Sequence, residues 1–326
     1  MEVPVQSRDN RKTRTSASLC LGILAVVLMG FYIWFKRDEF LAVSVLSWNS
    51  LLVVMLGIGI AGISTGLINY TMLRFLGVGI GFQVCFFLSV VTSAGNLIGP
   101  LRSGTILRAG YLRQKFGFQL THFVSTLFAF YLVMIITYAT AALGLLLWHK
   151  QKFSPEGSGL IIAVLIICIG ASLLFGLLPP IKRRGSWFLR KVSDVSDAWH
   201  VLRSTPSFLP WMAALSGVHL ISAVITLWGA FRAIGVELGL AQAIIVSTLG
   251  QLSTLISITP GSFGIYETVV AFVGQVMQVE PVQSVSAALI MRGANLVFLA
   301  VFTPLATYRI SRLAGIRDRE KRIGRE

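Results

Sequence analysis

The sequence predicts an all-α polytopic membrane protein with about six full spans and two interrupted, re-entrant helical hairpins in an inverted-topology repeat. Three observations predict this fold. The composition is strongly apolar, with 55% hydrophobic residues, 13% charged residues and a mean hydropathy of +0.78. Several runs of about 20 apolar residues follow one another, and each is long enough to cross a bilayer. Two apolar stretches also contain Pro-x-x-x-Gly, a pattern that breaks a helix.

Basic residues are concentrated in short blocks between the apolar runs. The 326 residues include 28 Lys and Arg against 13 Asp and Glu, which gives a formal charge of +15. Small basic blocks that flank spans are expected from the positive-inside rule, and they contact anionic lipid head groups. Nucleic acid is therefore not an expected partner. The expected location is the cytoplasmic (inner) cell membrane, with both termini in the cytoplasm.

The chain divides into a cytoplasmic N-terminal tail at 1–16, a transmembrane domain at 17–312 and a basic cytoplasmic tail at 313–326. The six full spans are expected at 17–35, 50–73, 119–148, 159–180, 210–231 and 282–308. A cleavable signal peptide is the alternative for the first span, but no small-x-small site stands out after it, so an uncleaved span is expected. The polar connector at 181–209 is expected to be an amphipathic helix on the inner leaflet or a solvated helix.

The second span carries several glycines. Gly57, Gly59, Gly62 and Gly66 occur at spacings that let a neighbouring helix approach closely. This face is therefore expected to be a packing surface.

Two interrupted segments lie within the apolar sequence, at 81–115 and 239–279. Backbone that departs from helix at membrane depth is tolerated only where protein buries it or where it lines a wet cavity. These segments are therefore predicted to form the functional centre. The residues expected to break the helices are Pro100, Gly104, Pro260, Gly261 and Gly264.

The two halves of the domain, about 50–148 and 210–308, resemble each other. Residues 74–82 match residues 232–240 at an offset of 158 (232 − 74), and the proline–glycine breaks follow at an offset of 160 (260 − 100). With both tails and the connector inside, each broken segment must enter and leave on the same side, either as a re-entrant hairpin or as an even number of passes. The first break then opens from the cytoplasm and the second from the exterior. This arrangement is an inverted repeat, which is associated with sites near the midplane and alternating access.

Ionisable residues at membrane depth define the expected site. Of the 13 acidic residues only Glu267 falls in the middle of an apolar segment, whereas Arg102, Arg108 and Arg292 also lie deep. Two interpretations are open. Either Glu267 pairs with Arg292 or an arginine of the first hairpin and locks the bundle, or the arginines bind a phosphate-bearing head group. In the second interpretation Glu267 balances charge or contacts a cationic part of the head group. Neutral hydrogen bonds are expected from Asn96, Ser103, Thr105, Thr259, Ser262 and Tyr266.

Signatures of catalysis and cofactor binding are missing from the sequence. It contains no nucleotide-binding phosphate loop and no Gly-x-Ser-x-Gly nucleophile elbow. Its three cysteines and four histidines show no metal-ligand spacing. The chain is therefore expected to use no cofactor or metal and not to be an enzyme.

The interrupted segments carry two ordered motifs. The first is Asn96-x-x-x-Pro100-x-Arg102-x-Gly104-x-x-x-Arg108, and the second is Thr259-Pro260-Gly261-x-x-Gly264-x-x-Glu267. Together they resemble the lysylphosphatidylglycerol synthase/flippase transmembrane-region family, and the similarity covers about residues 17–312. The resemblance implies that this stretch is a flippase-like transmembrane domain. With Arg292 added because of its depth, the head-group candidates are Asn96, Arg102, Arg108, Glu267 and Arg292.

The resemblance implies an integral membrane translocase that moves a phospholipid or lipid-linked molecule with an anionic head group between leaflets. The alternative is a membrane subunit that presents a lipid to a separate glycosyl- or aminoacyl-transferase. The resemblance also implies a homodimer. The soluble synthase domain does not accompany these motifs, so the chain is not expected to make lysylphosphatidylglycerol. Two departures from the family pattern leave the head-group chemistry open, namely Thr105 in place of a frequent acidic residue and Ser262 in place of a common glycine.

Overall fold

The computed structural model describes residues 30–31, 34–38, 47–99, 102–149, 155–177, 187–256 and 259–323, and these form helices and turns without a strand. Five helices are long and apolar enough to cross a membrane. They are α3 (Trp48–Phe75), α6 (Leu120–Trp148), α7 (Pro155–Leu177), α9 (Phe208–Ala233) and α12 (Pro281–Ile323). They coincide with five of the six predicted spans, and several apolar helices of this kind make the chain a multi-pass membrane protein. Most of the remaining predicted span, 17–35, lies outside the described residues.

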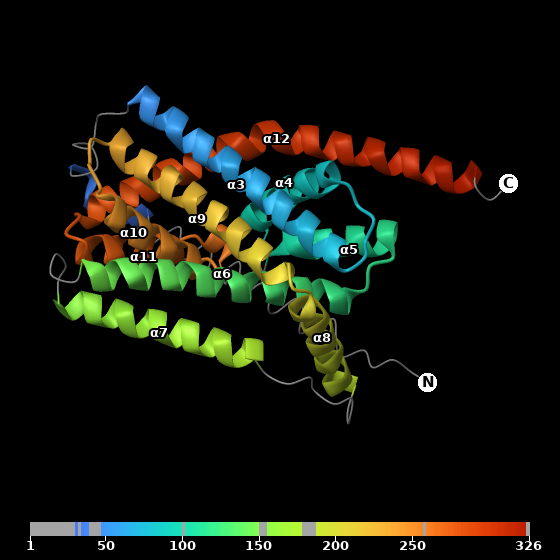
Figure 1. The fold of residues 1–326 in the computed structure, drawn as a ribbon. Helices are drawn as coiled ribbons and strands as arrows, with labels where there is room; N and C mark the ends of the chain where they lie inside the picture. Colours follow the sequence, from blue (N-terminus) through green and yellow to red (C-terminus); the bar gives the residue numbers. More distant parts are fainter. Residues whose placement is uncertain are drawn as a thin grey trace.

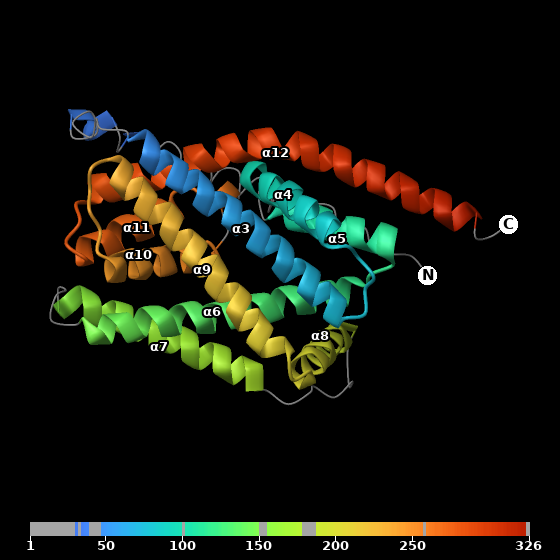
Figure 2. The same ribbon diagram turned by 45° about the horizontal axis from the view of Figure 1, so that its top comes forward.

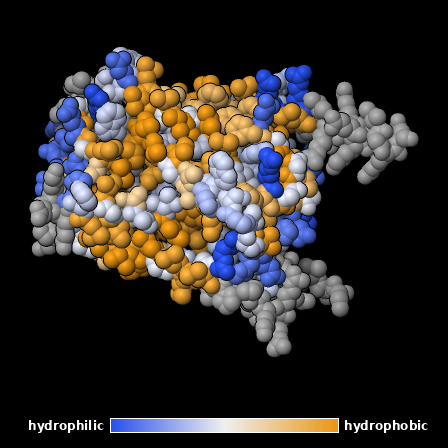
Figure 3. Space-filling model, viewed as in Figure 1, coloured by the Kyte–Doolittle hydropathy of each residue, from blue (hydrophilic) through white to orange (hydrophobic). Residues whose placement is uncertain are grey.

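The surface has the pattern that a bilayer requires. In Figure 3 hydrophobic side chains cover the middle of the visible face, and hydrophilic side chains gather toward its two ends. Large apolar side chains on α7 and α12, such as Ile167, Leu174 and Val301, are exposed. Because apolar side chains gain nothing by facing water, this exposed band is the part of the molecule that contacts lipid.

Four short helices form the interrupted segments where the sequence predicts them. In the first half they are α4 (Phe82–Ile98) and α5 (Ser103–Phe116). In the second half they are α10 (Leu240–Ser253) and α11 (Ile265–Val276), with the single 3-10 turn η2 (Pro260–Ser262) between them. Each half therefore has the same order of elements, which is a long helix, a turn, two short helices and another long helix (Figure 1).

The long helices that begin the two halves, α3 and α9, pack against each other in opposite directions. The backbone N–H of Ser47, just before α3, donates to the carbonyl of Ala233 at the end of α9 (3.3 Å). At the other end Phe75 of α3 contacts Phe208 of α9 with ring centroids 5.4 Å apart. Figures 1 and 2 show the two helices side by side along their length. This antiparallel pair is the central contact between the halves.

The glycine face of α3 is partly the packing surface that the sequence predicts. A Cβ on Gly57 would lie 2.9 Å from the backbone nitrogen of Thr226 in α9, and one on Gly66 would lie 3.0 Å from Cα of Phe86 in α4. Gly62 makes ordinary contact with aromatic rings, whereas nothing lies within 4 Å of a Cβ on Gly59. Gly57 and Gly66 therefore permit close helix approach, and Gly59 does not contribute to it.

Helices of one half also pack against those of the other. The hairpin helix α4 packs on α12, and α10 of the second hairpin packs on α6. The connector contains α8 (Trp187–Ser204), so its predicted helix is confirmed. Trp199 is buried, and its indole N–H and Arg203 both donate to the carbonyl of Gly176 near the end of α7 (3.1 and 2.7 Å). These bonds fix α8 across the end of α6 and α7.

The helix that carries the last predicted span extends beyond the membrane-compatible stretch, which ends at Leu313. The apolar run was expected to finish near residue 308, with a separate tail from 313, but α12 continues to Ile323. Arginine and lysine are good helix formers, so the change from apolar to basic sequence ends the membrane-compatible part and leaves the helix intact. Pro304 lies inside α12 without ending it.

The glycine contacts predict that alanine substitutions at Gly57 and Gly59 of α3 have different effects on stability. Gly57→Ala is expected to destabilise the protein by about 1–3 kcal/mol, because the added methyl overlaps Thr226 and forces α3 from α9. Gly59→Ala, at a position with no neighbour, is expected to leave stability unchanged or slightly raised. Thermal unfolding in detergent measures both. Equal losses in the two variants would contradict the proposed packing.

Candidate functional site

The first interruption is a helical hairpin in which α5 turns back along α4. A Cβ on Gly104 would overlap the carbonyl oxygen of Thr92 and lie 2.8 Å from the backbone nitrogen of Asn96, so only glycine fits there. The amide oxygen of Asn96 accepts a hydrogen bond from the backbone N–H of Thr105 (3.0 Å) and caps α5. Asn96 therefore holds the hairpin closed in this structure. Pro100 lies outside the described residues.

The second interruption contains three backbone units in the left-handed region. Gly261, Ser262 and Gly264 have φ of 58°, 55° and 83°. Glycine adopts this region freely, whereas serine does so at a cost of order 1–3 kcal/mol. Pro260 begins the 3-10 turn that carries the first two of them. The break is therefore a strained loop whose carbonyl groups lack helical hydrogen bonds and need other partners.

Arg292 of α12 supplies those partners. Its Nη1 donates to the carbonyl of Gly261 (2.9 Å), its Nη2 donates to the carbonyl of Ser262 (3.1 Å), and its Nε is paired with Oε1 of Glu267. The other carboxylate oxygen of Glu267, which is fully buried, accepts from the backbone N–H of Gly264 (2.8 Å). All three guanidinium nitrogens and both carboxylate oxygens are thus occupied. Of the two interpretations open from the sequence, the pair that locks the bundle is the arrangement observed.

Arg102 connects the first hairpin to both halves. It precedes α5 with a left-handed φ of 55°, and its guanidinium donates to the hydroxyl of Tyr131 in α6. It also donates to the carbonyl of Thr254, the residue that follows α10 (2.7 Å). This arginine therefore bridges α5, α6 and α10.

Arg108 is the remaining deep arginine, and its surroundings differ. It is buried on α5, where Nη1 donates to Oδ1 of Asn69 in α3 (2.7 Å) and the guanidinium stacks 5.0 Å from the ring centre of Phe123. Its Nε has no hydrogen-bond partner. Within the described part of the chain, no carboxylate forms an ion pair with it. Arg108 therefore combines a buried positive charge with an unused donor.

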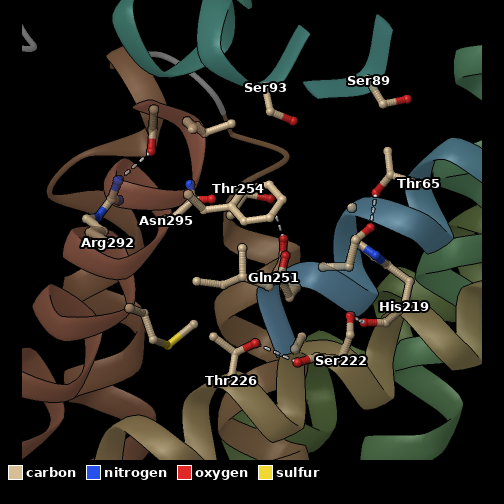
Figure 4. A pocket seen from close by; sticks show the side chains of 18 of the residues that line it. Thr65, Ser89, Ser93, His219, Ser222, Thr226, Gln251, Thr254, Arg292 and Asn295 are labelled. Atoms are coloured by element: carbon tan, nitrogen blue, oxygen red, sulfur yellow. Dashed lines mark hydrogen bonds between the residues drawn. The ribbon is translucent and has the colours of Figure 1, made fainter. Parts of the chain in front are cut away.

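Two cavities lie beside these arginines. A cavity of about 120 Å³ is lined by Arg108 together with amide and hydroxyl side chains from α3, α4, α5 and α6. A larger cavity of about 330 Å³ lies between α3, α4, α9, α10 and α12, with Arg292 in its wall. Figure 4 shows the polar side chains of the larger cavity around a common space. Both cavities are lined by Thr65, Ser89 and Ser93, so these three hydroxyls mark their shared wall.

The structure separates the predicted site residues into two groups. Asn96 and Arg108 line the smaller cavity, as does Thr105, whereas Arg292, Gly261 and Tyr266 line the larger one. Arg102, Gly104, Pro260, Gly264 and Glu267 line neither cavity and hold the breaks together. Sequence reasoning missed several lining residues whose only signal is a polar side chain in an apolar segment. They are Asn69, Gln251, Asn295, His219 and Tyr131.

Comparison with known families matches residues 19–302 to the model of the lysylphosphatidylglycerol synthase TM region. The chain belongs to this family. The match covers most of the 326 residues and includes both interrupted segments, so the resemblance based on the two motifs is confirmed. Comparison with curated proteins found no match. Membership of the lysylphosphatidylglycerol synthase TM-region family indicates a lipid-related role in the membrane.

The Glu267–Arg292 lock predicts a strong coupling between the two residues. Glu267→Ala leaves Arg292, whose side chain is only 13% exposed, without its charged partner and is expected to cost about 3–5 kcal/mol of stability. Arg292→Ala is expected to cost a similar amount, and the double variant is expected to cost much less than the sum of the two. Thermal unfolding in detergent provides the comparison, with the exposed Glu237→Ala as the control. Additive losses would contradict the lock.

The φ of Ser262 predicts that a glycine at this position stabilises the protein. Ser262→Gly relieves the left-handed strain and is expected to raise the melting temperature by about 1–3 °C. Ser286→Gly, inside α12, is the control, and it is expected to lower the melting temperature because glycine is a poor helix former. A loss of stability in Ser262→Gly would show that this conformation is not strained.

Proposed function

We propose that the protein is an integral membrane translocase, without enzymatic activity of its own, that moves a phospholipid or lipid-linked molecule with an anionic head group between the leaflets of the cell membrane. The observation that carries the proposal is Arg108, a buried cation that no described carboxylate neutralises, beside a polar cavity. Membership of the lysylphosphatidylglycerol synthase TM-region family supports a lipid as the ligand.

A phosphate group fits the chemistry around Arg108. Taking a charge out of water costs several kcal/mol unless a partner offsets it, and a guanidinium can hold a phosphate in a two-pronged hydrogen bond. The free Nε of Arg108 is a donor for such a bond. Hydroxyl and amide side chains on the same cavity, such as Thr105 and Asn69, are suited to the remaining phosphate oxygens. A bound anion would therefore neutralise the buried positive charge of Arg108.

The arrangement of the helices supports transport between leaflets. The hairpin helices have 12 to 17 residues, or about 18–26 Å of length, which is less than the roughly 30 Å of a hydrocarbon core. In our proposal each hairpin enters and leaves on one side, the first from the cytoplasm and the second from the exterior. The antiparallel α3 and α9 are then related as the first helices of an inverted repeat. Both chain termini lie in the cytoplasm in this arrangement.

Reconstitution into liposomes tests the proposal. The purified chain is expected to move fluorescent phosphatidylglycerol across the bilayer, and Arg108→Gln is expected to reduce the rate at least tenfold. Because the substitution removes an uncompensated buried charge, the stability of the variant is expected to be unchanged or raised. Arg113→Gln is the matched control, since it removes the same charge from an exposed position of the same helix.

The outcomes separate the proposed function from its alternative. Loss of transport in Arg108→Gln, with folding and the Arg113→Gln rate preserved, supports translocation through this site. Absence of transport by the unmodified chain, together with co-purification of a glycosyl- or aminoacyl-transferase, would overturn it in favour of lipid presentation. Cross-linking in the same vesicles tests the homodimer that the family resemblance predicts.

A further inference from the structure

The larger cavity offers many neutral polar groups and little free charge. The positive charge of Arg292 in its wall is already paired with Glu267, and its other nitrogens are bonded to carbonyls. The imidazole of His219 also lines the cavity, with Nδ1 3.0 Å from the hydroxyl of Ser64. The rest of the polar lining consists of hydroxyl and amide side chains (Figure 4).

Three of these side chains have unused hydrogen-bonding capacity. Gln251 of α10, Asn295 of α12 and Ser93 of α4 line the cavity, and within the described residues their side chains make no hydrogen bond. An amide offers two donors and one acceptor, and a hydroxyl offers both functions. Groups of this kind, exposed on one cavity from three different helices, are suited to bind the hydroxyls of a ligand.

A cationic substituent would find no counter-charge in this cavity. Glu267 is the only acidic residue of the chain within an apolar segment, and both of its oxygens are occupied. The other acidic residues of the second half, Glu237 and Glu280, lie outside the helices and are exposed. Because an unpaired ammonium is costly to desolvate, a lysyl group would be disfavoured here.

We infer, on the basis of the proposed function, that the lipid head group is a phosphate that carries an uncharged, hydroxyl-rich substituent such as a polyol or sugar. The phosphate binds Arg108 in the smaller cavity, and the substituent occupies the larger one beside Gln251 and Asn295. Thr65, Ser89 and Ser93 line both cavities, so the two spaces adjoin, and the bond between phosphate and substituent lies beside these three side chains. A volume of about 330 Å³ lies within the range of small-molecule sites.

Transport of three lipids with the same fluorescent acyl chain tests this inference in liposomes. Phosphatidylinositol carries an uncharged polyol, lysylphosphatidylglycerol carries a cationic substituent, and phosphatidic acid carries no substituent on its phosphate. Phosphatidylinositol is expected to move at least tenfold faster than lysylphosphatidylglycerol. A lysylphosphatidylglycerol rate equal to or above that of phosphatidylinositol would overturn the inference and leave translocation standing. Failure of all three lipids to move while phosphatidylglycerol is transported would overturn the inference alone, and failure of phosphatidylglycerol as well would overturn the proposed function and the inference with it.

Variants at Gln251 test whether the larger cavity is the part of the protein that distinguishes between these lipids. Gln251→Leu is expected to lower the phosphatidylinositol rate at least fivefold without changing the phosphatidic acid rate, because a site that binds ligand hydroxyls loses only that contribution. Gln275→Leu, an exposed position on α11, is the matched control. Gln251→Glu adds a carboxylate of similar shape and is expected to raise the rate for lysylphosphatidylglycerol relative to phosphatidylinositol. Equal effects of Gln251→Leu on phosphatidylinositol and phosphatidic acid would contradict the assignment.

Discussion

The α10–α11 break places the carbonyl groups of Gly261 and Ser262 outside helical geometry within a membrane protein, where such groups need partners in the protein. Arg292 satisfies two of them and pairs with Glu267, which in turn satisfies the backbone N–H of Gly264. The strained backbone, the buried carboxylate and the largely covered guanidinium therefore stabilise one another. Because Arg292 belongs to α12, this set of bonds also attaches the second hairpin to the long helix beside it.

Arg102, Arg108 and Arg292 all lie within apolar segments of the sequence, but their surroundings in the structure differ. Arg292 is neutralised by Glu267, and Arg102 bridges Tyr131 and a carbonyl near α10. Arg108 contacts Asn69 and keeps an unused donor beside a cavity. The printed bonds of Arg292 and Arg102 hold neighbouring segments together, whereas the Nε of Arg108 has no partner and is available to a ligand. This difference is why Arg108 carries the proposed function and the other two support the scaffold.

Much of the fold could be predicted because bilayer physics constrains sequence strongly. A span needs about 20 apolar residues, and a break at membrane depth needs proline or glycine, so five spans and both interrupted segments were predicted near their observed positions. The extent of α12 was not predictable from hydropathy, since basic residues such as Arg309 and Arg312 end the apolar run without breaking a helix. The glycines of α3 likewise suggested a packing face, but only their neighbours distinguish Gly57 from Gly59.

Hydropathy and the two ordered motifs were sufficient to establish an all-helical, multi-pass member of the lysylphosphatidylglycerol synthase TM-region family. They depend on local composition and spacing, which a linear chain displays directly. They left two partners open for Glu267, and they did not reveal that Asn69, Gln251 and Asn295 face cavities. Those outcomes depend on which helices meet across the bundle, because contacts between residues far apart in the chain arise only when α3, α4, α9, α10 and α12 pack together.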